Sequence, residues 1–374
     1  MPLSHRERVQ TALDHTVPDR CPMQISYTPE FASRLISHLK KKYPESFNKD
    51  TGKNIYELER ILDQDMLLTS PAWNNAYHQI YQPGEEFKDE WGIGWKAVPY
   101  DTKFGTGVYT EMIYHPLASD HVILSYQPPD PNPKELYEET ARVLEKFKDE
   151  YWIVGVTVTT IFEKAWALRG YEQIMIDMLI NPELVDRLFD IPYTYHLKMA
   201  ERLVRMGVDM IWIGDDVGSQ SSMLISPEHW KRFMKDKMAA FIQDLKNINP
   251  EIKIAYHSDG NISPIIPDLV EIGLDVLNPV QPGCMDPLRL KKEFGDKLCF
   301  WGSIDEQYTL PFGSPEDVMN EVFERIETLG KNGGLIIGPA HHVQLDTPME
   351  NFLAMVNAIR ESYSGSRKRG DGLY

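Results

Sequence analysis

The segment Ile252-Lys253-Ile254-Ala255-Tyr256 is a short apolar run that ends in residues capable of chemistry, His257-Ser258-Asp259. Three other runs have the same form: Met210-Ile211-Trp212-Ile213 before Asp215-Asp216, Leu298-Cys299-Phe300-Trp301 before Asp305-Glu306, and Gly334-Leu335-Ile336-Ile337 before His341-His342. Each run precedes a stretch of helical character, which is typical of parallel strands that alternate with helices. In a closed barrel of this kind the loops after the strands share one rim, and that rim carries the active site. We therefore expect the polar residues after the four runs to converge.

The length and charge of the chain limit its class. Its 374 residues exceed the roughly 250 of a typical barrel, which favours one barrel domain over residues 1–374 with an N-terminal elaboration. Hydrophobic residues make up 42% and charged residues 25%, the ordinary balance of a globular enzyme. The net charge of −17 argues against nucleic acid and anionic membranes as partners, because binding to phosphate groups needs clustered Lys and Arg.

The cysteine content and the N-terminus indicate the compartment. Only Cys21, Cys284 and Cys299 are present, and none forms a CxxC pair, so neither a zinc site of the usual cysteine spacing nor a disulfide framework is expected. The first residues are polar, and no run approaches the roughly 20 apolar residues of a membrane span. We expect a cytoplasmic enzyme whose oligomeric state is open, with a dimer as one alternative.

The pattern along the chain predicts an α/β barrel with an insertion. Strands are expected at residues 21–27, 66–70, 152–158, 209–213, 252–256, 275–279, 297–302 and 334–338. Helices are expected at 4–14, 29–43, 134–148, 171–180, 183–206, 227–247, 264–272, 286–294, 315–329 and 348–363. Residues 84–126 alternate between glycines and are rich in Trp and Tyr, which predicts an inserted antiparallel β-ribbon beside the mouth.

Several further stretches have a recognisable composition. They are Asp89-Glu90-Trp91-Gly92, His115-Pro116-Leu117-Ala118, Gly214-Asp215-Asp216, His257-Ser258-Asp259-Gly260-Asn261, Asp275-Val276-Leu277-Asn278-Pro279, Phe300-Trp301-Gly302 and Asp346-Thr347-Pro348-Met349. Together they resemble the uroporphyrinogen decarboxylase superfamily over nearly the whole chain. The resemblance implies a (β/α)8 TIM barrel with its cleft at the carboxyl ends of the strands, in agreement with the pattern of apolar runs.

The superfamily has two main branches. One decarboxylates a tetrapyrrole that carries acetate groups, and the other moves methyl groups between small donors, corrinoid proteins and thiol or pterin acceptors. The decarboxylases have an arginine-bearing motif after the first strand, but no arginine lies between Arg20 and Arg34 in this chain. Because a substrate with many carboxylates requires arginine forks, this departure favours the methyltransferase branch.

Within that branch the candidate metal ligands differ between subsets. The thiol-directed enzymes hold zinc with His-x-Cys and a later Cys, whereas this chain has His257-x-Asp259. It more closely resembles the methyltransferase I component of the corrinoid-dependent aryl-ether O-demethylases of acetogenic bacteria. Their zinc motif of Glu, fourteen residues, Glu, twenty residues and His matches Glu306, Glu321 and His342. Glu321 falls about six residues into an expected helix, so an ordinary helix-surface carboxylate is the alternative for that residue.

The candidate site residues form three sets. The catalytic candidates are His257, Asp259, Asp215 and Asp216, and of the last two one is expected to point inward while the other caps the next loop. The candidates for substrate binding are Gln24, Tyr27, Trp212, Tyr256 and Trp301, and the metal candidates are Glu306, Glu321 and His342. His341 is the weaker of the two adjacent histidines, because adjacent side chains point apart.

The sequence and the resemblance together predict methyl transfer. The donor would be a small phenyl methyl ether, of the vanillate or veratrol type, and the acceptor a corrinoid (cobalamin) carried by a partner protein. Zinc, or a protonated His257 oriented by Asp259, would neutralise the charge that develops on the ether oxygen. The alternatives are a decarboxylase that acts on a carboxylic acid through His257 and Asp215 or Asp216, and a barrel that binds a sugar or metabolite without catalysis.

Overall fold

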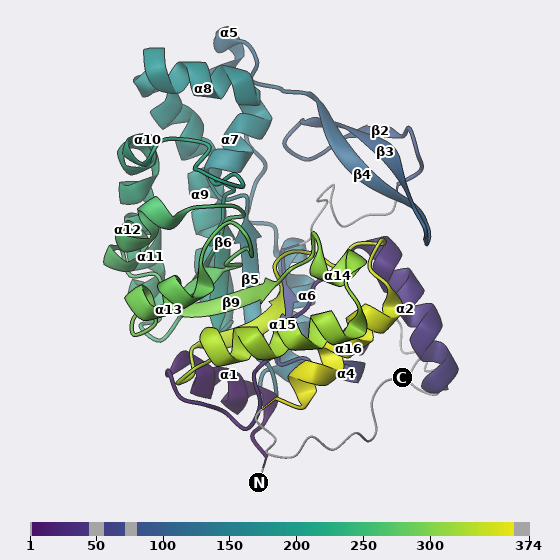
Figure 1. The fold of residues 1–374 in the computed structure, drawn as a ribbon. Coiled ribbons are helices and arrows are strands. Elements are labelled where there is room, and N and C mark those ends of the chain that lie inside the picture. Colours follow the sequence, from purple (N-terminus) through teal and green to yellow (C-terminus); the bar gives the residue numbers. More distant parts are fainter. Residues whose placement is uncertain (1, 45–55, 72–80, 363–374) are drawn as a thin grey trace.

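A parallel sheet of seven strands lies at the centre of the computed structural model, which describes residues 2–44, 56–71 and 81–362 (Figure 1). The strands pair in the order β1-β5-β6-β7-β8-β9-β10. They are β1 (Met66–Thr69), β5 (Trp152–Val158), β6 (Met210–Gly214), β7 (Lys253–His257), β8 (Val276–Asn278), β9 (Cys299–Ile304) and β10 (Leu335–Pro339). Consecutive strands of the sheet are thus neighbours in sequence, as in a barrel of repeated strand–helix units.

Residues 21–27 occupy the eighth position, between β10 and β1. Met23 forms a parallel bridge with Ile337 of β10, and the backbone N–H of Gln24 donates to the Ile337 carbonyl over 3.1 Å. Gly338 allows this approach, because a Cβ at that position would overlap the carbonyl oxygen of Gln24. The predicted first strand is therefore present as an extended segment with isolated bridges.

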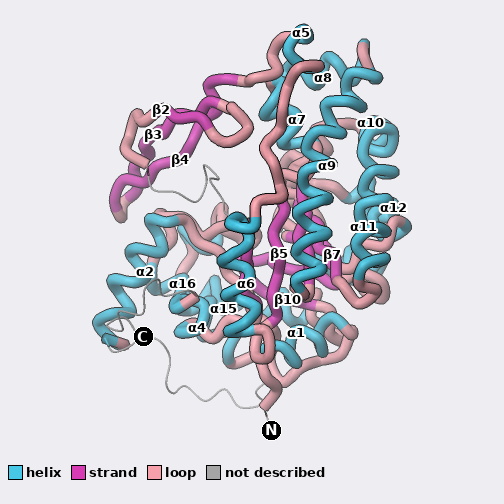
Figure 2. The backbone as a smooth tube through the Cα atoms, turned by 180° about the vertical axis from the view of Figure 1, so that it is seen from behind, coloured by secondary structure: helices cyan, strands magenta, loops and turns pink. Residues whose placement is uncertain are grey.

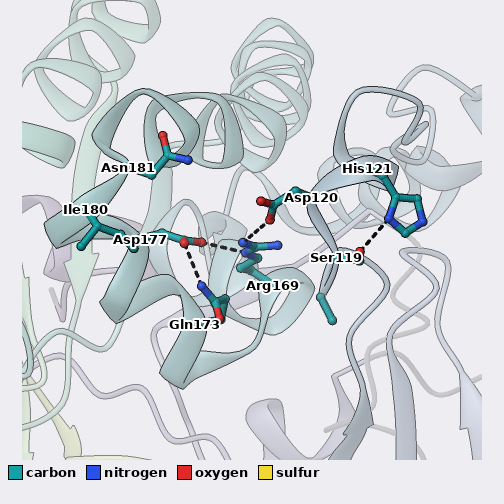
Figure 3. A pocket seen from close by; sticks show the side chains of 9 residues that line it. Ser119, Asp120, His121, Arg169, Gln173, Asp177, Ile180 and Asn181 are labelled. Atoms are coloured by element: carbon teal, nitrogen blue, oxygen red, sulfur yellow. Dashed lines mark hydrogen bonds and ion pairs between the residues drawn. The ribbon is translucent and has the colours of Figure 1, made fainter.

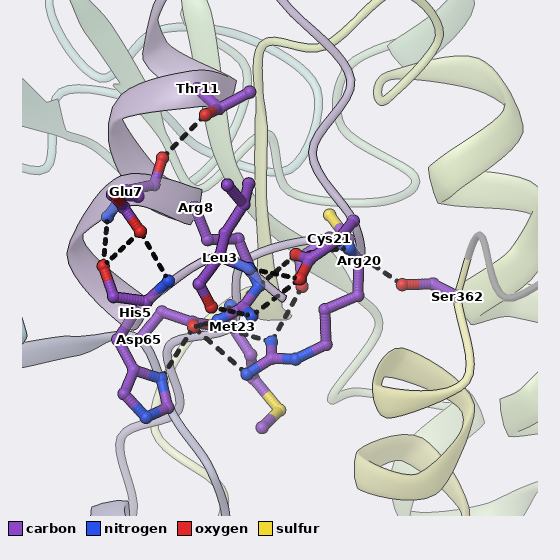
Figure 4. Close-up of polar contacts among 12 residues, drawn as sticks. Leu3, His5, Glu7, Arg8, Thr11, Arg20, Cys21, Met23, Asp65 and Ser362 are labelled. Atoms are coloured by element: carbon purple, nitrogen blue, oxygen red, sulfur yellow. Dashed lines mark hydrogen bonds and ion pairs between the residues drawn. The ribbon is translucent and has the colours of Figure 1, made fainter. Parts of the chain in front are cut away.

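The buried carboxylate of Asp65 joins this segment to its neighbours (Figure 4). It accepts hydrogen bonds from Arg8 Nη1 at 2.6 Å, Arg20 Nη1 at 2.6 Å and the backbone N–H of Met23 at 2.7 Å, and it lies 3.0 Å from His5 Nδ1. Burial acts to raise the pKa of Asp65, but the contact with His5 and the charges of Arg20 and Arg8 hold that pKa below its usual value. The carboxylate stays ionised and ties helix α1 (His5–Leu13), residues 21–27 and β1 together.

Helix α1 closes the amino-terminal end of the barrel. Ser4 and Glu7 form a capping box that starts the helix, and Val9 and Leu13 point from it into the barrel. The interior is filled by side chains that alternate along the strands: Met66, Trp152, Val154, Met210, Ala255, Val276, Cys299, Trp301 and Ile336, with Leu68 and Trp212 packed against them. The barrel is therefore solid below its mouth.

Helices surround the sheet on its outer face (Figure 2). They are α2 (Pro29–Lys42), α4 (Glu57–Ile61), α5 (Asp120–Ile123), α6 (Glu138–Phe147), α7 (Phe162–Arg169), α8 (Tyr171–Ile180), α9 (Pro182–Met206), α10 (Pro227–Trp230), α11 (Asp236–Ile248), α12 (Ile266–Glu271), α13 (Pro287–Phe294), α14 (Thr309–Phe312), α15 (Pro315–Thr328) and α16 (Met349–Arg360). Short helical turns η1 (Lys134–Tyr137), η2 (Lys231–Lys235) and η3 (Ser263–Ile265) adjoin α6, α10 and α12. Within the described part of the chain, none of these helices combines the length and apolar composition that a membrane crossing requires.

The predicted ribbon is a separate three-stranded antiparallel sheet between β1 and β5 in the sequence (Figure 1). It consists of β2 (Glu86–Lys88), β3 (Gly94–Thr102) and β4 (Gly105–Tyr114), so it ends earlier than the predicted range 84–126. At its base Trp91 packs edge-on against Tyr195 of α9, and at its tip the Arg34 guanidinium of α2 lies 3.8 Å from the centre of the Phe104 ring. The ribbon thus reaches from α9 to α2.

The first prediction concerns the closure of the barrel. Asp65→Asn retains the size of the side chain but leaves buried Arg8 and Arg20 without their shared counterion. We expect the free energy of unfolding to fall by about 3–5 kcal/mol, as when one partner of a buried ion pair is removed. Denaturant titration measures the loss. The control is Asp186→Asn, which removes an exposed partner of Arg232 and should cost much less; equal losses would contradict a special role for Asp65.

The second prediction concerns pH. Because the pKa of Asp65 is lowered in the folded state, its stabilising contribution is complete above the unfolded-state pKa of about 3.9. It is lost as the pH falls through the lower folded-state value. The difference in unfolding free energy between the wild type and Asp65→Asn should therefore be constant near neutral pH and narrow in acid. If the difference in unfolding free energy widened in acid, the pKa of Asp65 would not be lowered by folding.

Candidate active site at the carboxyl ends of the strands

His257 lies at the end of β7, level with the ends of β6 and β8. Gly214 of β6 pairs with it, and a Cβ on that glycine would lie 2.6 Å from the His257 Cβ. On the other side Asn278 Nδ2 donates to the carbonyl of Trp301 over 2.9 Å, which leaves Asn278 Oδ1 facing His257 Nδ1 at 2.6 Å. This amide oxygen can only accept, so His257 carries a proton on Nδ1 and directs Nε2 towards the carboxylates at the mouth.

Two carboxylates face the Nε2 atom of His257. Oδ1 of Asp216 lies 3.6 Å from it and Oδ1 of Asp259 lies 3.9 Å from it, while the Asp259 backbone N–H donates to Asp216 Oδ1 over 2.8 Å. Burial acts to lower the pKa of His257, but the charges of Asp259 and Asp216 and the contact with Asn278 raise it above the ordinary value. The imidazole is thus held in one orientation and favours its protonated form when no cation is bound.

A third strand end contributes His341, from the loop after β10. One potential ligand atom each from His257, Asp259 and His341 lies within 4.8 Å of the others. The ring centres of His257 and His341 are 6.0 Å apart. Two imidazole nitrogens and a carboxylate oxygen form a donor set that suits zinc.

Glu306, from the loop after β9, adjoins this group. Its carboxyl accepts a hydrogen bond from the backbone N–H of His341, but its Oε2 is buried without a partner among the described residues. Burial, together with the charges of Asp259 and Asp305, raises the pKa of Glu306 to about 9. This oxygen lies beside two histidines and an aspartate, and a bound cation would stabilise it. The residues present are therefore compatible with a zinc ion.

The adjacent residues Asp215 and Asp216 point in different directions. The Asp215 carboxylate accepts backbone hydrogen bonds from Ile161 at 3.0 Å and Glu163 at 2.9 Å, at the start of α7. Burial raises the pKa of Asp215 to about 7. Asp215 thus orients α7, and the Glu163 carboxylate of that helix accepts a hydrogen bond of 3.1 Å from the Asp216 backbone N–H. The side chain of Asp216 faces His257. Glu163 was missed because α7 was not predicted.

The predicted set Glu306, Glu321 and His342 does not come together. Among the described residues these three do not offer ligand atoms within 4.8 Å of one another. The buried Glu321 accepts hydrogen bonds from the Asp305 backbone N–H at 3.0 Å and from Arg325 Nη2 at 3.1 Å, so it holds the turn after β9. The neighbouring His341 belongs to the compact group instead, and the assignment from spacing stays a prediction.

Trp212 and Trp301 lie beneath the polar group, inside the barrel. Their ring centres are 4.6 Å apart, and the edge of Trp212 lies against the His257 ring with centres 5.6 Å apart. Gln24, on the eighth strand position, is buried and its Nε2 donates to Ser26 Oγ over 3.0 Å. The two indoles therefore form an apolar layer below the histidine and carboxylate side chains.

The structure places Tyr27 and Tyr256, two of the predicted substrate-binding residues, away from the mouth. Successive side chains of a strand point to opposite faces. Ala255 lies inside the barrel, so Tyr256 lies outside it, where its ring is packed between the sheet and the helices. Tyr27 packs in the same outer layer, and its hydroxyl donates to Glu59 of α4 over 3.2 Å. Neither ring lines the mouth of the barrel.

A separate hollow of about 620 Å³ lies between α5, α7 and α8 (Figure 3). The Arg169 guanidinium at its base donates to Asp177 at 2.7 Å, to Asp120 at 2.6 Å and to the Leu117 carbonyl at 3.0 Å. Because protein groups occupy three sides of this cation, the arrangement fixes the segment after the ribbon against α7. The chemistry-bearing side chains converge at the barrel mouth, away from this hollow.

Comparison with known proteins finds one matching family and two kinds of relative, a methyltransferase and a decarboxylase. The model of the family described as uroporphyrinogen decarboxylase (URO-D) matches residues 96–362. A methylated-thiol–coenzyme M methyltransferase of Methanosarcina mazei is 26% identical over 238 residues, which cover 60% of each chain. A uroporphyrinogen decarboxylase of Legionella pneumophila is 27% identical over 158 residues, 42% of each chain. The chain thus spans about three fifths of the length of the first relative and about two fifths of the second.

A solved structure of similar fold covers more of the chain. A methyltransferase from Methanosarcina mazei superposes with a TM-score of 0.68 at 20% sequence identity, and the match covers 96% of this chain and 99% of that one. At this level of identity the match shows a shared fold. It confirms the predicted TIM-barrel architecture of strands and helices.

The third prediction separates the two adjacent histidines. His341→Ala removes a nitrogen of the compact group, so we expect zinc affinity to fall by at least the 10- to 100-fold that loss of an outer-shell partner causes. His342→Ala is the matched control and should retain zinc. Metal content after dialysis against a competing chelator measures both. Loss of zinc from His342→Ala alone would support the assignment from spacing instead.

Proposed function

The chain belongs to the uroporphyrinogen decarboxylase (URO-D) family, and on that premise we propose that it is a methyltransferase that delivers a methyl group to a corrinoid carried by a partner protein. The observation that carries the proposal is the group of His257, Asp259 and His341 at the barrel mouth, with Trp212 beneath it. The methyltransferase relative and the methyltransferase of similar fold support the same branch.

The charge of the mouth disfavours the decarboxylase alternative. Asp216 and Asp259 face His257, and residues 21–33 contain no arginine. A tetrapyrrole with several carboxylates would meet like charges here instead of the guanidinium forks that carboxylates require. A small methyl donor with at most one carboxylate has far less of this conflict.

We propose a phenyl methyl ether as the donor. The aromatic ring of the donor would lie against Trp212, whose indole forms part of the layer beneath the site. When the methyl–oxygen bond breaks, the oxygen keeps the electron pair, and the phenolate that would leave has a conjugate acid with a pKa of about 10. His257, with Nε2 facing Asp216 and Asp259, is positioned to donate a proton to that oxygen.

Two further groups would complete the chemistry. Zinc held by His257, Asp259 and His341 would act as a Lewis acid at the ether oxygen in place of the proton. A corrinoid carried by the partner would supply reduced cobalt as the nucleophile for the methyl carbon. The residues of this chain contribute by orienting the ether and stabilising negative charge on its oxygen, an interaction that accelerates the reaction only if it strengthens in the transition state.

The fourth prediction tests the reaction. The purified protein, incubated with cob(I)alamin and vanillate or veratrol, should give methylcobalamin absorbance and one phenol for each methyl group transferred. His257→Gln should lower the rate by about 10²- to 10⁴-fold, the usual contribution of a positioned acid. His121→Gln, at an exposed histidine of the separate hollow, is the control and should leave the rate unchanged.

Other outcomes would contradict parts of the proposal. Methylcobalamin formed from a methylated thiol but from no aryl ether would retain methyl transfer and replace the donor class. Carbon dioxide released from a carboxylic acid, with no methylcobalamin from any donor, would favour decarboxylation.

A further inference from the structure

Three glutamine side chains from different loops meet above the candidate site. Gln220 follows β6, Gln281 follows β8 and Gln307 follows β9. The Oε1 atom of Gln307 accepts from Gln220 Nε2 at 3.3 Å and from Gln281 Nε2 at 3.5 Å. We call these three residues the amide cluster.

The amide cluster is attached directly to the candidate site. Gln281 Oε1 accepts a hydrogen bond of 2.7 Å from the backbone N–H of Gly260, the residue after Asp259. Gln307 is the residue after Glu306, and its backbone N–H donates to Asp305 Oδ1 over 2.9 Å. A ligand that covered the mouth would therefore contact these amides.

The hydrogen bonds within the amide cluster are long and easily exchanged. At 3.3 and 3.5 Å they exceed the usual 2.9–3.0 Å of N–H···O bonds, and Gln220 and Gln307 are exposed to solvent. Each carboxamide has two N–H donors and an oxygen with two lone pairs, so unused donors remain on all three. A ligand with its own amides can replace the long contacts with shorter ones at small cost.

Exposed apolar side chains lie on two of the loops that carry the amide cluster. Tyr308 and Phe312 of the β9 loop are 73% and 75% exposed, and Leu224 of the β6 loop is 37% exposed. Exposed apolar side chains beside neutral polar groups are typical of a surface that contacts a ligand or partner. The rim thus offers neutral hydrogen bonding and apolar contact beside the carboxylates of Asp259 and Asp305.

We propose that the amide cluster binds the primary carboxamides at the edge of the corrin ring that the partner protein presents to the mouth. This inference rests on the proposed function. A corrin is a broad, mostly apolar macrocycle edged by carboxamide side chains, so amide–amide pairs and the apolar side chains match its two kinds of surface. An anionic ligand of similar size is disfavoured, because Asp259 and Asp305 lie next to the cluster.

The experiment measures binding separately from methyl transfer. Hydroxocobalamin binding to the full chain is followed by calorimetry for the wild type, Gln307→Leu and Gln220→Leu. We expect the Kd to rise about 2- to 12-fold in each variant, the range that corresponds to one net hydrogen bond. The control is Gln243→Leu, which removes an amide bonded to Asn247 on the outer helix α11 and should leave the Kd unchanged. A corrin heptacarboxylate, with acids in place of the amides, should bind more weakly than cobalamin.

Each outcome supports or overturns the inference. If both variants bind cobalamin as tightly as the wild type, or the heptacarboxylate binds equally well, the amide cluster does not recognise the corrin. If the variants raise the KM of the methyl donor and leave cobalamin binding unchanged, the amides contact the donor and the inference fails. If cobalamin binding depends on the amides but no donor yields methylcobalamin, the inference holds and the proposed function fails.

Discussion

The contacts of one buried carboxylate, that of Asp65, determine how this barrel closes. A regular barrel closes by continuous hydrogen bonds between its first and last strands. Here residues 21–27 form one isolated bridge to β10, between Met23 and Ile337, and on the β1 side the Asp65 carboxylate accepts a hydrogen bond from the Met23 backbone N–H. Arg8 and Arg20 compensate the charge, so the closure depends on an ionic cluster at the base of the barrel. Because the cluster also holds α1, the same contacts close the ring and plug its lower end.

Closure of the barrel brings the reactive side chains at the mouth together. His257 and His341 follow strands that are separated by β8 and β9, and an open sheet would hold their loops further apart. The curved sheet brings their rings to 6.0 Å, with Asp259 beside them and Glu306 contributed by the loop between. Asn278 then fixes the direction of the His257 ring through a bond to the strand behind it. The geometry of the site therefore follows from the strand register and from few side-chain contacts.

The sequence predicted the features that depend on hydrophobic periodicity, but it did not predict those that depend on the conformation of the loops. Apolar runs identified the strands, and the position of His257 at a strand end followed from them. The outward direction of Tyr256 was available from the same alternation, since Tyr256 and His257 are adjacent in one strand. Helix α7 was not predicted because Ala167 is buried on the side opposite Phe162, Ala165 and Leu168, which leaves no amphipathic pattern. The choice between His341 and His342 depends on the turn after β10, which no local pattern specifies.

The vertical order of side chains at the mouth fits the small donor and the large acceptor that we propose. The indoles of Trp212 and Trp301 form an apolar floor, and the histidines and carboxylates above them concentrate negative charge where a proton or a cation is needed. At the rim the polar groups become neutral amides among exposed apolar side chains. Deep in the mouth the carboxylates favour a proton on His257 or a bound cation, and that positive charge would stabilise the negative charge that develops on the ether oxygen. At the rim, neutral groups can hold a bulky ligand without a large desolvation cost. A polyanion would be repelled by Asp216 and Asp259 deep in the mouth, so the arrangement fits the small ether and the corrin that we propose better than a substrate with many carboxylates.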